Sequence, residues 1–131
     1  MSFSETIKNQ ARELGFDLVG IAKAEKLDAA QLDDWLQRGF HGNMEWMATR
    51  RDLRLDLSTL VPDARSIIVC AINYFWPEDT ESDPEYARIS RYGWGDDYHD
   101  LVRTRLKQLI AFTQEQQPCN GRVFVDSAPV M

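Results

Sequence analysis

A continuous run of apolar residues, SIIVCAINY at 66–74, constrains the fold of this chain more than any other segment. The turn signal Val61-Pro62-Asp63 precedes the run and Pro77 closes it. A short apolar run with such boundaries is typical of a strand that is buried on both faces of a sheet. We therefore expect a strand at 66–74, in the centre of a small sheet that helices cover.

Helical patterns account for most of the chain before this run. Ser2 and Glu5 have the spacing of a capping box, and apolar residues then recur at helical spacing until Gly15. A second helix is expected at 28–39, between a capping aspartate and a glycine. Asn43 can cap a short third helix, whose two methionines and tryptophan form either a core or interface stripe or a soft wall for a cofactor.

The remaining expected elements are a strand at 16–22, a single helical turn at 56–60, a long helix at 98–116 and a last strand at 122–126. Asp96 or Asp97 can cap the long helix, whose apolar positions lie along one side. A length of 131 residues suits one domain. We predict a single domain over residues 1–131, of the mixed α+β (α/β) class, with helices packed on a small mixed sheet.

The ends of the chain and its composition predict its relation to a longer protein and its cellular compartment. An apolar APVM ending directly after a strand is unusual, so we expect the chain to be a fragment of a longer protein. Its longest apolar run is too short for a membrane span, and its first residues lack a signal-peptide pattern. We expect a cytoplasmic protein that makes no membrane contact. Cys70 and Cys119 form no CxxC motif, which indicates buried or incidental thiols.

The net charge of −6 argues against binding of nucleic acid by bulk electrostatics. Basic residues are nevertheless concentrated at 50–65 and again at 103–107, whereas 78–85 is strongly acidic. A local basic patch is therefore compatible with the negative total.

The segment SRYGWGDDYHD at 90–100 combines glycines, aromatic rings, aspartates and a histidine at the start of the long helix. Glycine lets a backbone approach a ligand closely, aromatic rings can lie on a flat ring system, and a helix N-terminus offers free amide donors. The segment is either part of a ligand site or a loop that caps the helix and covers the core. His99, in the first turn, either contacts a ligand or bonds a carbonyl.

Asp126 follows three β-forming residues at the end of the last expected strand. Ligand-facing groups are common at such a position in sheets with helices. An aspartate there is also a common cap or turn residue. The residues alone leave both interpretations open.

Four segments of the chain form a recognisable set: HGNMEWM at 41–47, LVPDARSIIVCAINY at 60–74, ISRYGWGDDYHDLVRTRLKQL at 89–109 and VFVDSAPV at 123–130. Together they resemble the epoxyqueuosine reductase family, cobalamin-dependent iron–sulfur enzymes that complete queuosine in tRNA. The segments follow the family's order and spacing, and the resemblance covers essentially the whole chain. Its most specific parts are the RY-x-x-G-x-DYH and VDSAP patterns.

The resemblance implies that the epoxide of epoxyqueuosine in tRNA is opened reductively, with base-off cobalamin and electrons from two [4Fe-4S] clusters. The clusters belong to a ferredoxin-like region downstream of this chain, so we expect the chain alone to be inactive. By the same resemblance, Asp126 is the proton donor of the reaction. The residues that it places at the cofactor are Arg54, Arg91, Tyr92, Asp97, Tyr98 and His99.

One departure and two alternatives qualify the match. Asp96 is acidic where the family often has a basic residue, which puts a phosphate or cofactor contact there in doubt. The alternatives are a related corrinoid reductase of a small molecule, or a corrinoid-binding or interaction module without catalysis. For the tRNA partner, the arginines expected at the interface are Arg50, Arg51, Arg103 and Arg105.

Overall fold

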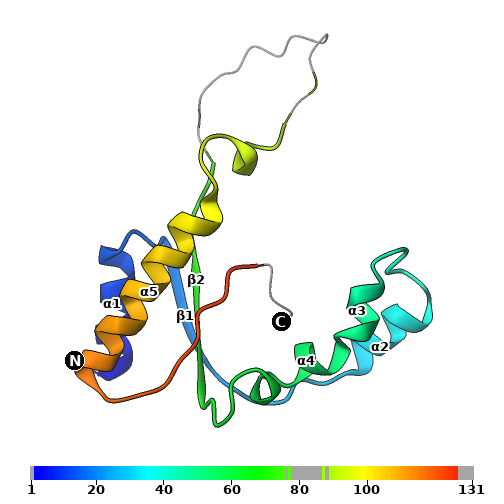
Figure 1. Ribbon diagram of the computed structural model, residues 1–131, viewed down its shortest axis with the longest axis horizontal. Coiled ribbons are helices and arrows are strands. Elements are labelled where there is room, and N and C mark those ends of the chain that lie inside the picture. Colours follow the sequence, from blue (N-terminus) through cyan, green and yellow to red (C-terminus); the bar gives the residue numbers. More distant parts are fainter. Residues whose placement is uncertain (1, 76, 78–86, 88, 127–131) are drawn as a thin grey trace.

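The computed structural model describes residues 2–75, 77, 87 and 89–126. Its elements follow in the order α1 (Phe3–Glu13), β1 (Leu18–Lys23), α2 (Ala30–Gln37), α3 (Glu45–Thr49), α4 (Arg51–Leu55), η1 (Leu57–Thr59), β2 (Ser66–Ala71), η2 (Arg91–Gly93) and α5 (Tyr98–Gln116) (Figure 1). This mixture confirms the expected fold class. The bounds of α5 agree with the long helix expected at 98–116.

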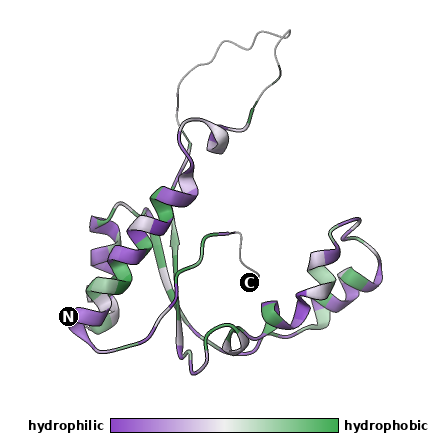
Figure 2. Cartoon of the chain, viewed as in Figure 1, coloured by the Kyte–Doolittle hydropathy of each residue, from purple (hydrophilic) through white to green (hydrophobic). Residues whose placement is uncertain are grey.

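The two strands form an antiparallel sheet, and one face of it carries the core. Val19 pairs with Cys70 and Ile21 pairs with Ile68. These four side chains share one face because side chains alternate along a strand. They pack against a buried cluster from α1, α5 and the turn between α1 and β1, which consists of Ile7, Ala11, Phe16 and Leu109. Hydrophobic and hydrophilic residues alternate around α5, as expected of a helix with one face on a core (Figure 2).

The strand expected at 66–74 is present as β2, but it is half-buried rather than buried on both faces. Within the described residues the sheet has two strands, so β2 lies at an edge and not in the centre. Leu18 and Val69, on the face away from the core, are 71% and 57% exposed. The run is apolar because one face packs on helices, while Ile67 and Val69 on the other face line a cavity.

The strand expected at 122–126 is wrong, because these residues form no strand. Neither of the two described strands pairs with them. They belong to a segment that leaves the end of α5 and runs back along the molecule (Figure 1). At Gly121, a Cβ atom would lie 2.5 Å from Cδ1 of Ile110, so glycine lets this segment pass close to α5.

The observed caps of the shorter helices agree in part with those predicted from the sequence. Asp28 accepts a hydrogen bond from the Ala30 amide at 3.1 Å at the start of α2. For α3, the expected cap Asn43 is not used, since the helix begins after Met44 without a side-chain cap. Asp56 caps η1, the helical turn expected at 56–60, by accepting from the Ser58 amide at 3.0 Å.

Helices α2 and α3 form an arm that extends beside the main body (Figure 1). Arg51, on α4, reaches across to α2 and forms a two-pronged ion pair with Asp33. This contact holds the pKa of Asp33 below its usual range, because the guanidinium donates to the carboxylate. The sequence did not predict α4, the short helix that provides this arginine.

Candidate active site

The N-terminus of α5 positions the first group of candidate site residues. Asp97 is its N-cap, and its Oδ1 accepts a hydrogen bond from the His99 amide at 2.9 Å. This bond satisfies one of the free amides of the first turn. It confirms Asp97 rather than Asp96 as the cap, and it fixes the place of Tyr98 and His99 on the first turn.

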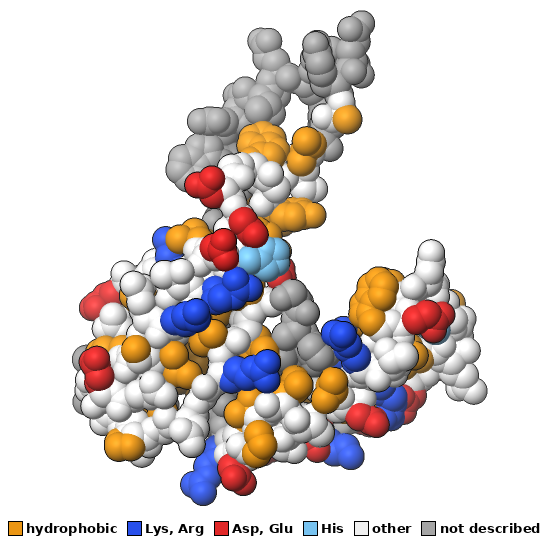
Figure 3. All heavy atoms as spheres, viewed as in Figure 1, with side chains coloured by type: hydrophobic (Ala, Val, Ile, Leu, Met, Phe, Trp, Pro, Cys, Tyr) orange, Lys and Arg blue, Asp and Glu red, His pale blue; other side chains and the backbone are white. Residues whose placement is uncertain are grey.

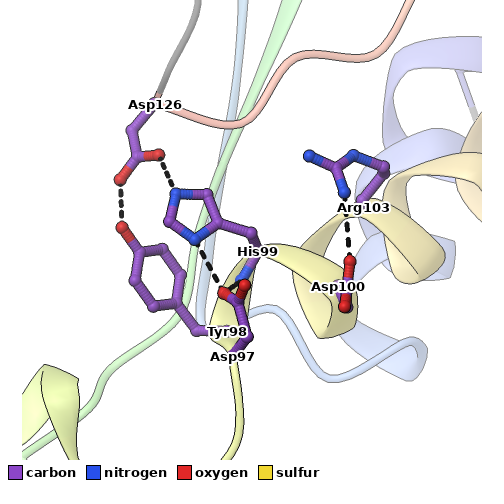
Figure 4. Close-up of polar contacts among 6 residues, drawn as sticks. All are labelled: Asp97, Tyr98, His99, Asp100, Arg103 and Asp126. Carbon is purple, nitrogen blue, oxygen red and sulfur yellow. Dashed lines mark hydrogen bonds and ion pairs between the residues drawn. The ribbon is translucent and has the colours of Figure 1, made fainter.

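Asp126 lies against this first turn although it is 28 residues from Tyr98 in the chain. Its Oδ1 is 2.9 Å from Nε2 of His99, and its Oδ2 accepts a hydrogen bond from the Tyr98 hydroxyl. On the other side of the imidazole, Nδ1 of His99 is 2.7 Å from Oδ1 of Asp97 (Figure 4). The imidazole therefore lies between two carboxylates. We call Asp97, Tyr98, His99 and Asp126 the carboxylate–imidazole cluster.

The two carboxylates favour the charged form of His99. Its pKa is raised, chiefly by the hydrogen bond with Asp97 and further by the charge of Asp126, while desolvation opposes the rise. The pKa of Asp97 is lowered, first by the His99 amide and then by its ring. When the ring is protonated both nitrogens donate, so each carboxylate receives one N–H. The His99 side chain is 32% exposed and that of Asp126 is 58% exposed, which leaves the cluster open to a ligand.

Tyr98 keeps its proton in this arrangement. The hydrogen bond to Asp126 raises the pKa of Tyr98 to about 12, so the phenol remains a donor near neutral pH. The Tyr98 ring also stacks on the His99 ring, with centroids 4.1 Å apart and planes 26° apart. Tyr92 contacts Tyr98 edge-on at 6.2 Å, and Tyr74 contacts Tyr92 edge-on at 6.1 Å. A row of four rings thus ends at the carboxylate–imidazole cluster.

Arg54 lies elsewhere, in a cavity of ≈ 200 Å³ between α4 and the outer face of the sheet. The lining is mostly apolar and includes Leu53, Leu57, Ile67 and Val69. The Nε atom of Arg54 is buried there and has no hydrogen-bond partner among the described residues. A buried donor without a partner is costly, and it is a donor that a ligand acceptor can satisfy.

The structure brings together four of the residues singled out from the sequence, in the carboxylate–imidazole cluster, and adds Tyr92 through ring contacts. Arg91 instead places its guanidinium over Phe75. Among the described contacts, none joins Arg54 to the cluster. Sequence reasoning missed Tyr74 and Phe75, and the signal available was two aromatic residues directly after an apolar strand.

In Figure 3, a hollow separates the body that carries α5 from the α2–α3 arm. The carboxylate–imidazole cluster belongs to the body, and Arg54 lies on α4, which directly follows the arm in the chain.

Within the described ranges, no group of three or more His, Cys, Asp or Glu could hold a metal ion. Cys70 and Cys119 are free, and burial raises the pKa of the Cys70 thiol. No helix among the described residues is long and apolar enough to cross a membrane.

Solved structures share this fold. An epoxyqueuosine reductase from Streptococcus thermophilus superimposes with a TM-score of 0.74 at 23% identity, over 99% of this chain and 36% of that protein. An epoxyqueuosine reductase crystallised with a tRNA-Tyr epoxyqueuosine-modified stem loop has a TM-score of 0.70 at 22% identity, over 98% of this chain and 35% of its own. At these identities the likeness establishes the mixed α/β fold class.

The family follows from the sequence comparison. The family model described as epoxyqueuosine reductase QueG, DUF1730, matches residues 54–127, more than half of the chain, and the chain belongs to this family. An epoxyqueuosine reductase of Leadbetterella byssophila is 42% identical over 132 residues, which is 98% of this chain and 43% of the relative. One of Pseudomonas aeruginosa is 42% identical over 135 residues, 98% of this chain and 37% of the relative. The chain thus spans less than half the length of these curated relatives.

Proposed function

We propose that residues 1–131 form the N-terminal, cobalamin- and substrate-facing domain of an epoxyqueuosine reductase, an oxidoreductase that converts epoxyqueuosine in tRNA to queuosine. The family match and the names of the relatives support this activity. The observation in this chain that carries it is the contact of Asp126 with both His99 and Tyr98. His99 can supply protons to the exposed carboxyl group of Asp126, and Tyr98 orients that group.

Conversion of an epoxide to an alkene breaks two C–O bonds, and it takes two electrons and two protons to release the oxygen as water. A carboxyl group held beside the leaving oxygen can deliver a proton to it. In our proposal Asp126 delivers that proton from its carboxyl oxygen. His99 Nε2, at 2.9 Å, can return a proton to Asp126, and Asp97 keeps the imidazole charged for this purpose.

Tyr98 has a positioning role in this proposal. Its hydroxyl donates to Oδ2 of Asp126, while His99 contacts Oδ1, so the two oxygens have different neighbours. The stacked Tyr98 and His99 rings hold these donors in a fixed relation. A carboxyl group restrained in this way needs less reorganisation when the substrate arrives.

Cobalamin fits the residues that this chain offers. The Nε donor of Arg54, which is buried and has no partner in the part of the chain that the structure describes, suits an amide carbonyl or the phosphate of the cofactor periphery. The cavity around it is only ≈ 200 Å³, so it would hold a side arm of the cofactor and not the macrocycle. When bound, cobalamin would supply a strongly reducing cobalt centre for opening of the epoxide. We propose further contacts on the cofactor side from Arg91, Tyr92, Asp97, Tyr98 and His99.

The electron supply and the partner complete the proposal. Two [4Fe-4S] clusters, held outside residues 1–131, would deliver the electrons. The tRNA would contact the basic residues. The four arginines that we expected there differ in whether they already have partners within the fold. Arg51 is ion-paired with Asp33 and Arg105 donates to the Gly15 carbonyl, so both have roles within the fold. Arg50 and the more loosely paired Arg103, 44% exposed, are the stronger candidates.

The test is Asp126→Asn in the complete gene product, loaded with cobalamin and clusters. Asparagine keeps the shape and removes the transferable proton. We expect single-turnover conversion of epoxyqueuosine in a tRNA stem loop to fall by roughly 10²-fold or more. Cobalamin content and RNA affinity should stay near the wild-type values. A variant that turns over at the wild-type rate would remove Asp126 from the chemistry.

A further inference from the structure

Two aromatic residues near η2, Phe75 and Trp94, have no part in the chemistry or in the cofactor contacts proposed above. Phe75 follows β2 and Trp94 follows η2, and they are 62% and 45% exposed. The guanidinium carbon of Arg91 lies 5.0 Å from the ring centre of Phe75 and 5.7 Å from that of Trp94. Arg91, for which we also propose a cofactor contact, thus lies close to two rings that both remain open to solvent. We call Phe75, Arg91 and Trp94 the aromatic–arginine cluster.

The turn that carries this cluster is held by its own hydrogen bonds. The indole Nε1 of Trp94 donates to the Ile89 carbonyl at 3.1 Å, and the Trp94 amide donates to the Arg91 carbonyl at 3.0 Å. Gly95 follows with φ +86°, a conformation that other residues rarely adopt. The orientation of the indole is therefore set before a ligand binds, which reduces the entropy lost on binding.

The aromatic–arginine cluster is adjacent to the carboxylate–imidazole cluster. Tyr92, next to Arg91 in sequence, contacts Tyr98 edge-on, and Tyr98 donates to Asp126. Hydrophobic side chains are grouped over η2 and the start of α5 (Figure 3). A ligand that places its reacting part at Asp126 would therefore bring its neighbouring part to these rings.

Exposed rings beside a guanidinium have the chemistry that binds an unpaired nucleobase. A base has two π faces that stack on aromatic side chains or on an arginine plane, and loops of RNA are recognised in this way. The arrangement suits a base better than a phosphate, because the guanidinium carbon lies over two exposed rings, at 5.0 Å from one ring centre and 5.7 Å from the other. An exposed apolar group of this kind on a small domain marks an interaction surface.

We propose that the aromatic–arginine cluster is a stacking platform for an unpaired base of the substrate RNA, next to the nucleoside that reacts at Asp126. This inference rests on the proposed function, since it takes an RNA loop as the substrate. The platform holds the loop by ring stacking, so it contributes affinity that depends weakly on salt, in contrast to phosphate contacts.

The experiment uses the complete gene product with cobalamin bound and an RNA stem loop that contains epoxyqueuosine. 2-Aminopurine replaces one loop base beside the modified position, because its fluorescence is quenched on stacking. We expect Trp94→Ala to raise the Kd about 5- to 150-fold and to relieve the quenching seen with wild-type protein. Trp94→Phe keeps a ring and should restore most of both signals.

Phe40→Ala is the matched control, because Phe40 is also 62% exposed and has the Arg38 guanidinium 5.9 Å from its ring, but it follows α2. We expect its Kd to stay within about twofold of wild type. Phe75→Ala, in a segment outside the helices, is the second platform variant and gives the result even if Trp94→Ala does not fold. Circular dichroism decides whether each variant is folded.

Unchanged Kd and unchanged quenching in both platform variants would overturn the inference, and the proposed function would stand if the wild-type protein still converts epoxyqueuosine. A variant that loses cobalamin but binds RNA normally would assign the rings to the cofactor and would also overturn it. A wild-type protein that neither binds nor converts the stem loop would overturn the proposed function itself.

Discussion

Leu109→Ala tests the placement of α5, which carries the first turn with Tyr98 and His99. Leu109 is 3% exposed and belongs to the buried cluster with Ile7, Ala11 and Phe16. Truncation of such a leucine removes buried apolar contacts and leaves a cavity, at a cost of about 2–5 kcal/mol. With unfolding entropies typical of a domain of this size, the thermal midpoint should fall by roughly 5–20 °C.

The same substitution on the same helix provides the control. Leu101 is 49% exposed, so Leu101→Ala should change the free energy of unfolding by no more than about 0.5 kcal/mol. Both variants are compared by thermal unfolding followed by circular dichroism at 222 nm, the usual wavelength for helix content. Equal losses of stability in the two variants would refute the assigned orientation of α5, because burial would then not distinguish the two positions.

Three further predictions concern the site. His99 is stabilised as the imidazolium, so its contribution to stability is fully present below its unfolded pKa, about 6.5, and is lost as pH rises through the higher folded pKa. NMR titration of the imidazole should show a lower midpoint in Asp97→Asn, and an unchanged midpoint would exclude Asp97 as the main cause. Arg54→Ala should reduce the cobalamin retained through purification of the complete gene product. A cobalt content equal to that of the wild-type protein would contradict this prediction. Charge reversal of Arg50 should flatten the salt dependence of tRNA affinity, whereas the same slope as wild type would remove it from the interface.

Local signals in the sequence were sufficient to predict α5. Its capping aspartate, its apolar periodicity and the following Pro118 gave the same bounds as the structure, 98–116. β2 was also predictable as a strand, because its apolar run is short and has turn signals at both ends. Both elements are specified by residues that lie within or next to them.

Features that depend on distant partners were not predictable in the same way. The segment at 122–126 has strand-forming residues, but a strand must pair with another strand, and neither described strand pairs with this segment. The burial of β2 depends on what covers its second face, which its own residues do not specify. The contact of Asp126 with His99 joins two segments that only the path of the chain past Gly121 brings together.

The helix α5 joins the buried core to the carboxylate–imidazole cluster, so a tilt of the helix in the core would move His99 at its other end. Leu109 fixes the helix in the core, and His99 lies ten positions earlier, about 15 Å away at 1.5 Å per residue. A tilt of the helix by about 5° around Leu109 would displace the imidazole by roughly 1.3 Å, which is enough to break a hydrogen bond that is 2.9 Å long. Small changes of volume beneath α5 would therefore be amplified at the contact between His99 and Asp126. Under the proposed function, side chains remote from Asp126 would then change the reaction rate through the angle of one helix.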